Sequence, residues 1–181
     1  DGTTNYAHGF PCFCVSIGLQ VREEVVLGVV YDPFHEEMFL AQKGQGAFLN
    51  NRPLSVSKIE KLSGSLVVTG FNWRSIRRNL QHFADFSRRV QGIRRTGSAA
   101  LDLCYVAMGR FEGYWELMLS PWDMAAGSLI VTEARGKVTN FRGGPFSILS
   151  KQVLATNGRI HNEMVETLKM GNKRRKRGIK K

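Results

Sequence analysis

The 181-residue sequence has no apolar run that approaches the ~20 residues needed to cross a bilayer, and no signal-peptide pattern. It also lacks an internal repeat, a G-x-G-x-x-G fingerprint and a Walker-type glycine loop, so a nucleotide cofactor is not indicated. Its three cysteines have no zinc-site spacing, and its four histidines form no H-x-x-x-H pair. We therefore expect no membrane partner and no zinc site. The apolar neighbours of the cysteines indicate core packing in a reducing compartment, and we expect a cytoplasmic location.

The basic residues are unevenly distributed. Of the net charge of +11, seven Lys and Arg lie in residues 173–181, which leaves 19 basic against 15 acidic residues, or +4, elsewhere. Such a run is typical of a disordered, solvated tail, although it could also bind nucleic acid. Further arginines keep open a non-catalytic function in RNA or protein binding; these are Arg77, Arg78, Arg88, Arg89, Arg94 and Arg95. No aromatic stacking platform interleaves with them.

The hydrophobic pattern predicts an α/β (α+β) fold that changes character near Lys61. Before it, β-branched runs separated by turn residues predict an antiparallel meander, with strands at 13–19, 24–31, 37–41 and 47–49. After it, strands alternate with helices, which predicts a βαβα sheet covered by helices on both faces. We expect a layered sandwich of two parts, 1–61 and 62–172, followed by the basic tail 173–181. The last helix is expected to run from about 159 to 170.

One strand-to-helix junction, residues 116–127, carries two carboxylates, Glu116 and Asp123. Ser120 and Pro121 are typical of an N-cap and a first helical position, and Asp123 completes a capping box, so Asp123 belongs in the first helical turn. The helix dipole favours an ionised carboxylate there, which suits a hard cation such as Mg²⁺. These residues are equally compatible with a plain capping aspartate. Gly136 is expected to end the helix.

Two motifs together resemble the signatures of the inositol monophosphatase family. They are Asp1-Gly-Thr-Thr-Asn5 and Trp122-Asp-Met-Ala-Ala-Gly127, with Gly97-Ser-Ala99 and Glu116 at the intermediate positions. The resemblance covers the chain to about residue 170. The first signature of the family, D-P-x-D-G-T, begins with an aspartate that this sequence lacks, so we expect that the sequence starts inside the motif and that any targeting signal would not be visible.

The resemblance implies roles for eight residues. Asp1 and Asp123 match magnesium ligands, and Gly2 and Thr3 match residues that bind phosphate through their backbone. The Thr3 hydroxyl would help to hold the attacking water, so the implied catalytic residues are Asp1, Thr3 and Asp123. Substrate contacts are implied for Gly2, Thr3, Gly97, Ser98, Ala99, Glu116 and Asp123, with Ser98 where the family has threonine.

The implied activity is Mg²⁺-dependent, lithium-sensitive hydrolysis of inositol monophosphate, or a related polyol or sugar phosphate, by a metal-activated water. The family also implies a homodimer. Within the wider superfamily, fructose-1,6-bisphosphatase and 3′-phosphonucleotidase activities remain open. Because an upstream aspartate and glutamate that the family uses as ligands are absent, we expect the 181-residue chain by itself to be inactive.

Overall fold

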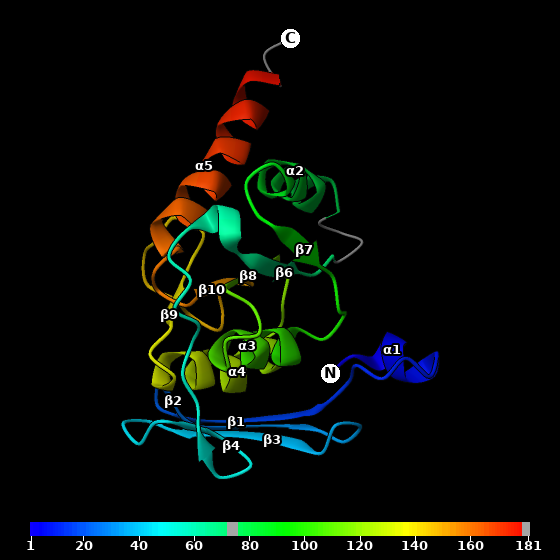
Figure 1. The fold of residues 1–181 in the computed structure, drawn as a ribbon, viewed down its shortest axis with the longest axis vertical. Coiled ribbons are helices and arrows are strands. Elements are labelled where there is room, and N and C mark those ends of the chain that lie inside the picture. The colour runs from blue at the N-terminus through cyan, green and yellow to red at the C-terminus, as the bar shows by residue number, and fades with distance from the viewer. Residues whose placement is uncertain (72–75, 179–181) are drawn as a thin grey trace.

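The computed structural model describes residues 1–71 and 76–178, which stack in four layers (Figure 1). A five-stranded sheet is followed by a pair of helices, a second five-stranded sheet and another pair of helices. This arrangement confirms the predicted layered sandwich of the α/β class. Across the described ranges, no helix combines the length and the apolar composition that crossing a membrane requires.

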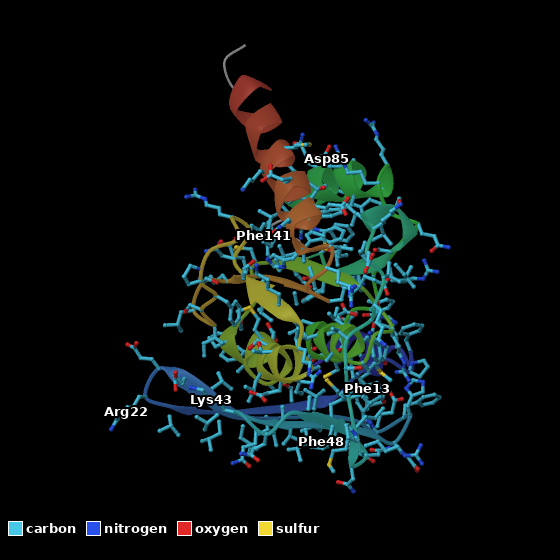
Figure 2. All side chains as sticks on the ribbon, turned by 60° about the vertical axis from the view of Figure 1, so that its left-hand side comes forward. Phe13, Arg22, Lys43, Phe48, Asp85 and Phe141 are labelled. Carbon is cyan, nitrogen blue, oxygen red and sulfur yellow. The ribbon has the colours of Figure 1, made fainter. Side chains whose placement is uncertain are left out.

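The first sheet is an antiparallel meander, as predicted. Its strands lie in sequence order and comprise β1 (Val15–Val21), β2 (Glu24–Asp32), β3 (Glu37–Gln42), β4 (Ala47–Leu49) and β5 (Arg52–Pro53). A short helix, α1 (Thr3–Ala7), precedes it where the sequence pattern indicates only a turn. Side chains of this sheet project toward the helix layer and also from the outer face (Figure 2), where Ile17 is 59% exposed.

The second sheet is mixed and has the order β7-β6-β8-β10-β9. Its strands are β6 (Leu66–Thr69), β7 (Gly92–Arg94), β8 (Gly113–Leu117), β9 (Lys137–Thr139) and β10 (Gln152–Thr156). Strand β6 runs parallel to β7 and β8, whereas β10 is antiparallel to β8 and β9. Helices cover both faces, with α3 (Ala99–Ala107) and α4 (Pro121–Glu133) on one and α2 (Ile76–Ser87) and α5 (His161–Gly178) on the other. A 3₁₀ turn, η1 (Leu62–Gly64), leads into β6.

Two helix ends differ from the sequence prediction. Helix α5 continues to Gly178, so residues 173–178 are helical here rather than part of a disordered tail, and Lys and Arg are good helix formers. The side chains from 171 onward, and residues 179–181, lie outside the described part. Helix α4 ends at Glu133, and Arg135 rather than Gly136 takes the left-handed conformation, with φ of 70°. A side chain at Gly136 would instead collide with Val131 and with the backbone of Thr156.

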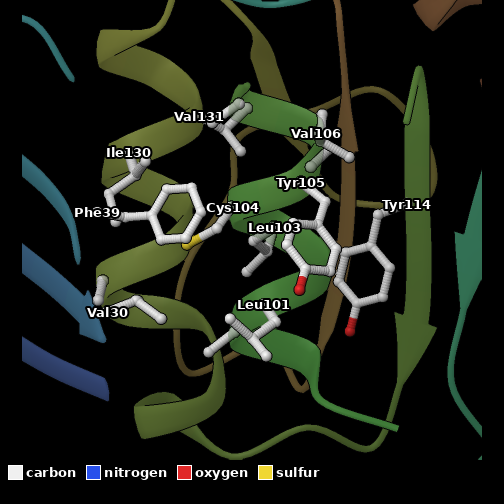
Figure 3. Packing of buried hydrophobic residues seen from close by; sticks show 14 of the residues in the cluster. Val30, Phe39, Leu101, Leu103, Cys104, Tyr105, Val106, Tyr114, Ile130 and Val131 are labelled. Carbon is white, nitrogen blue, oxygen red and sulfur yellow. The ribbon is translucent and has the colours of Figure 1, made fainter. Parts of the chain in front are cut away.

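The largest core cluster fills the space between the two sheets (Figure 3). Val30 and Phe39 of the first sheet meet Cys104 of α3 and Ile130 of α4 there, and all four are fully buried. Burying a side chain of this size stabilises a fold by about 1.5–3 kcal/mol. Side chains from both sides of residue 61 therefore form one shared core. All three cysteines are buried and unpaired, which confirms their predicted packing role.

Small residues let α4 lie very close to the first sheet. A Cβ at Gly28 would lie 2.7 Å from the carbonyl oxygen of Ala126, and one at Gly18 would lie 2.7 Å from the Cβ of Ala125. On another side of the helix, Gly127 makes room for Leu103 of α3. The low bulk of residues 125–127 therefore serves helix–sheet and helix–helix packing.

Candidate active site

A cavity of about 210 Å³ lies where the end of β8 meets the first turns of α3 and α4. Six of the eight predicted site residues line it, namely Asp1, Gly97, Ser98, Ala99, Glu116 and Asp123. The remaining lining residues are Gly70, Phe71, Arg95, Asp102, Met118 and Leu119. A larger hollow of about 590 Å³ near the end of α4 contains none of the predicted residues, so the smaller cavity is the candidate active site.

Asp1 is held against the first turn of α3 by three hydrogen bonds. Its Oδ2 accepts from the Ser98 hydroxyl and from the Ala100 N–H, both at 2.8 Å, and its Oδ1 accepts from the Gly2 N–H at 2.8 Å. Ser98 is the N-cap of α3, and its hydroxyl also accepts from the Leu101 N–H at 3.4 Å. Serine thus keeps the hydroxyl that a threonine would supply at this position, and it orients the Asp1 carboxylate.

The turn before α3 depends on Gly97 and Asn5. Gly97 has a φ of 95°, which favours glycine, and a Cβ there would lie 2.9 Å from the side-chain nitrogen of Asn5. That nitrogen donates to the carbonyls of Cys12 at 2.7 Å and Thr96 at 2.9 Å. The first motif is therefore joined to the Gly97-Ser98-Ala99 turn by the side chain of Asn5, to which the sequence analysis gave no role.

Asp123 lies in the first turn of α4, and its Oδ2 accepts from the N–H of the N-cap residue Ser120 at 2.8 Å. This is the predicted capping interaction. Asp123 also lines the cavity, and its Oδ1 accepts no hydrogen bond from any described residue. The two roles that the sequence left as alternatives are therefore compatible, because one oxygen caps the helix and the other is available to a ligand.

Glu116 is 8% exposed near the end of β8, and its Oε2 accepts a hydrogen bond of 2.7 Å from the Tyr114 hydroxyl. Burial raises the pKa of Glu116 to about 7, and the charge of Asp123 adds to the rise. The Tyr114 hydrogen bond and the charge of Arg95 oppose it. A carboxyl group that titrates near neutral pH in a cavity is typical of a functional site.

Asp102, for which the sequence motifs predicted no role, is 1% exposed in α3 and lines the same cavity. Its Oδ1 accepts from the Thr96 hydroxyl at 2.5 Å. Burial raises the pKa of Asp102 well above its usual range. An acid within the apolar run Ala99–Ala107 is a signal that could have identified it, because buried carboxylates are rare unless they have a function or a partner.

The structure does not bring Gly2 and Thr3 to the cavity wall. Gly2 is buried with a φ of 82°, and a Cβ there would collide with the backbone of Cys12 and Phe13. Thr3 is exposed at the start of α1. Their predicted roles in binding phosphate and water therefore stay predictions.

The chemistry of the donor set suits magnesium. Mg²⁺ usually binds one or two carboxylates together with waters and substrate phosphate oxygens, and Asp1 and Asp123 present hard oxygen ligands at one cavity. In the ranges 1–71 and 76–178, no group of three or more His, Cys, Asp or Glu side chains converges as a metal site. The two carboxylates fit a magnesium ion that shares its coordination with a bound phosphate.

Comparisons with known proteins bear on the family of this chain. The family model for the inositol monophosphatase family matches residues 1–171. The chain is 47% identical to an inositol-1-monophosphatase of Synechocystis over 93% of its own length, and 45% identical to the Nus factor SuhB of Vibrio cholerae over 88%. It spans only 60% and 61% of the lengths of these two relatives.

A solved structure supports the same assignment. The inositol monophosphatase of Anabaena superposes with a TM-score of 0.91 at 49% identity, over 94% of this chain and 69% of that one. The family model, the relatives and the Anabaena structure all indicate the family whose two sequence motifs this chain resembles. The chain belongs to the inositol monophosphatase family.

Proposed function

We propose that the protein hydrolyses phosphate monoesters of inositol, or of a related polyol or sugar, with Mg²⁺ as cofactor. The observation that carries this proposal is the meeting of Asp1 and Asp123 at one small cavity, each at the first turn of a different helix. Helix N-termini favour anions, so the two helices supply positive dipole ends to a phosphoryl group beside these carboxylates.

Different residues are proposed to orient the metal ligands, bind the phosphate and contact the alcohol part of the substrate. Ser98 and the Ala100 N–H orient Asp1, and the Ser120 N–H orients Asp123, so both proposed magnesium ligands are held before substrate arrives. Bound Mg²⁺ would neutralise phosphoryl charge, activate water and stabilise the leaving oxygen. Gly2 and Thr3 would bind phosphate through their backbone, and the Thr3 hydroxyl would orient the attacking water. Glu116 and the Gly97-Ser98-Ala99 turn would contact the alcohol part of the substrate.

The test is made in the full-length protein, extended upstream of Asp1, because the 181-residue chain by itself is expected to be inactive. It replaces Asp123 with asparagine, which keeps an oxygen that can accept from the Ser120 N–H but loses the charge. We expect phosphate release from inositol 1-phosphate at millimolar Mg²⁺ to fall by about 10² or more, because a charged ligand to the cation is lost. The melting temperature should stay within a few degrees of the wild-type value. Near-normal turnover at saturating Mg²⁺ would refute the role of Asp123. Inhibition of the wild-type protein by lithium is expected in the same assay.

Two further properties are part of the proposal. We expect a homodimer, which analytical ultracentrifugation would reveal.

The Vibrio cholerae relative is named a Nus factor, and we keep nucleic-acid binding by the basic residues 173–181 as a second function, although their side chains lie outside the described residues. Retention of RNA that depends on salt, without release of phosphate, would favour this second function over hydrolysis.

A further inference from the structure

Met118, which has no role in the two motifs, combines three features at the candidate active site. It lines the cavity, it is 42% exposed, and its backbone lies in the left-handed region with a φ of 64°. We propose that the Met118 side chain forms an apolar wall at the cavity mouth and favours phosphate monoesters of ring alcohols over those of short open-chain alcohols. This inference rests on the proposed phosphatase function and adds a specificity-determining residue to it.

The backbone of Met118 is held by its neighbours in the second sheet. The pairing of β8 with β10 ends one residue before Met118. The N–H groups of Met118 and Leu119 then both donate to the carbonyl of Lys151, at 2.6 and 3.3 Å. Lys151 has a φ of 54°, so two left-handed residues lie opposite each other where the chain leaves the sheet for α4.

A glycine would meet this backbone requirement with less strain. The left-handed region is uncommon for residues with a Cβ, and methionine lacks the short polar side chain with which Asn and Asp stabilise it locally. Gly97, the other residue of the cavity lining with a positive φ, is a glycine. Position 118 therefore carries a large side chain where the backbone favours none, which points to a role for that side chain.

The alternation of β8 places Met118 on the cavity side of the second sheet. Tyr114 packs in the core between the two sheets, whereas Trp115 and Leu117 pack in the cluster on the opposite face. Glu116 lines the cavity, and Met118 is the next residue of this alternation. Because Met118 also lines the cavity and is exposed, it lies where the cavity opens to solvent.

Met118 is the large apolar residue of the lining that is most accessible to a ligand. The other two are Phe71 and Leu119. Leu119 is 7% exposed, and Phe71 is half-buried, with its ring 5.9 Å from that of Phe83 in α2. Most of the remaining lining is polar or charged, so an apolar part of a substrate has its most open contact at Met118.

The alcohol part of a ring ester suits this contact. With its phosphate at Asp1 and Asp123, the ring would place its carbon face against Met118 and remove apolar surface of both from water. Methionine is flexible and polarizable, so its side chain can adapt to such a face. An open-chain alcohol as short and polar as glycerol has no comparable face and would gain little from this contact.

The experiment compares two esters of secondary alcohols, cyclohexyl phosphate and glycerol 2-phosphate, in the full-length protein extended upstream of Asp1. The quantity measured is the ratio of kcat/KM for cyclohexyl phosphate to kcat/KM for glycerol 2-phosphate. We expect Met118→Gly to lower this ratio about tenfold, mainly through KM, because roughly two methylene-sized groups lose their contact. Met118→Leu keeps an apolar side chain and should retain most of the ratio.

Lys151→Gly is the matched control. Lys151 has the same kind of left-handed backbone and lies opposite Met118, but it does not line the cavity. Glycine relieves the positive φ and also adds freedom to the unfolded chain, so both glycine variants should melt within about two degrees of the wild-type protein. Lys151→Gly should leave the ratio of kcat/KM within about twofold, because it removes no side chain from the cavity.

The outcomes separate this inference from the proposed function. If Met118→Gly and Lys151→Gly change the ratio equally, the backbone rather than the Met118 side chain sets the preference, and the inference is wrong. It is also wrong if Met118→Gly lowers kcat for both esters by one factor, or if the wild-type protein hydrolyses inositol 1-phosphate but not cyclohexyl phosphate. If the wild-type protein releases phosphate from none of the three esters, the phosphatase proposal itself fails, and the inference fails with it.

Discussion

Replacing Glu116 with glutamine should stabilise the metal-free protein at high pH. The side chain is 8% exposed, and its folded-state pKa of about 7 lies above the ordinary value of 4.5. Because the folded pKa is raised, the folded state of the wild-type protein is favoured below pH 4.5, and this contribution is lost as the pH rises through 7. The pKa difference corresponds to about 3 kcal/mol. Glutamine has no charge to bury and can still accept from Tyr114.

The measurement is thermal unfolding in EDTA from pH 4.5 to 8.5. We expect the Glu116→Gln variant and the wild-type protein to converge at the acid end and to differ by about 3 kcal/mol above pH 7, or about 8 °C in melting temperature for a chain of this length. Glu23→Gln, which changes an exposed carboxylate, is the control and should show no such divergence. A difference between Glu116→Gln and wild type that does not change with pH would refute burial as the cause of the raised pKa.

Three other perturbations test the fold and the tail. Gly28→Ala should destabilise the protein by about 1–3 kcal/mol, because its Cβ would collide with the backbone of Ala126. Equal melting of this variant and Gly64→Ala, whose new Cβ would come no closer than 4.0 Å to a neighbouring side chain, would contradict that contact. Burial lowers the pKa of His161 to about 4, so the stability that neutral His161 contributes is present above pH 6.5 and lost as the pH falls through 4. The pKa difference corresponds to about 3 kcal/mol of unfolding free energy. In denaturant titrations, His161→Gln should therefore reduce the loss of stability between pH 6.5 and 4. In the full-length protein, deletion of residues 173–181 should leave phosphate release unchanged and remove most RNA retention on filters at low salt; loss of catalysis would show that the tail is needed for activity.

Much of the fold followed from local patterns. The meander and the alternation after residue 61 were predicted because strand and helix periods are visible in short windows. Helix α1 was missed because a five-residue helix has no hydrophobic period of its own. The end of α4 was misplaced at Gly136 because the pattern shows that a glycine is present but not whether conformation or space requires it.

The residues of the candidate site were predicted where they belong to a sequence motif. A residue that reaches the cavity only through the tertiary structure was missed. Asp1, Ser98, Glu116 and Asp123 were identified from the motifs, and the structure places them around one cavity. Asp102 was not, because an isolated acid in a helix is usually on a solvated face. The apolar run around Asp102 is a sign of burial, but only the tertiary structure shows that Asp102 lines the same cavity as the motif residues.

The close contact between α4 and the first sheet ties the position of Asp123 to residues far from any substrate. Asp123 and Ala126 are one helical turn apart, and Ala126 lies against Gly28, so an added methyl group on that strand would push on the same rigid helix that presents the carboxylate. A shift of a few tenths of an ångström that leaves the protein folded would still displace a proposed ligand of the magnesium ion. Substitutions at Gly18 and Gly28 would then be selected against for loss of activity, as substitutions at a metal ligand are. In a screen that scores only turnover, variants of these glycines would be indistinguishable from variants of the site itself.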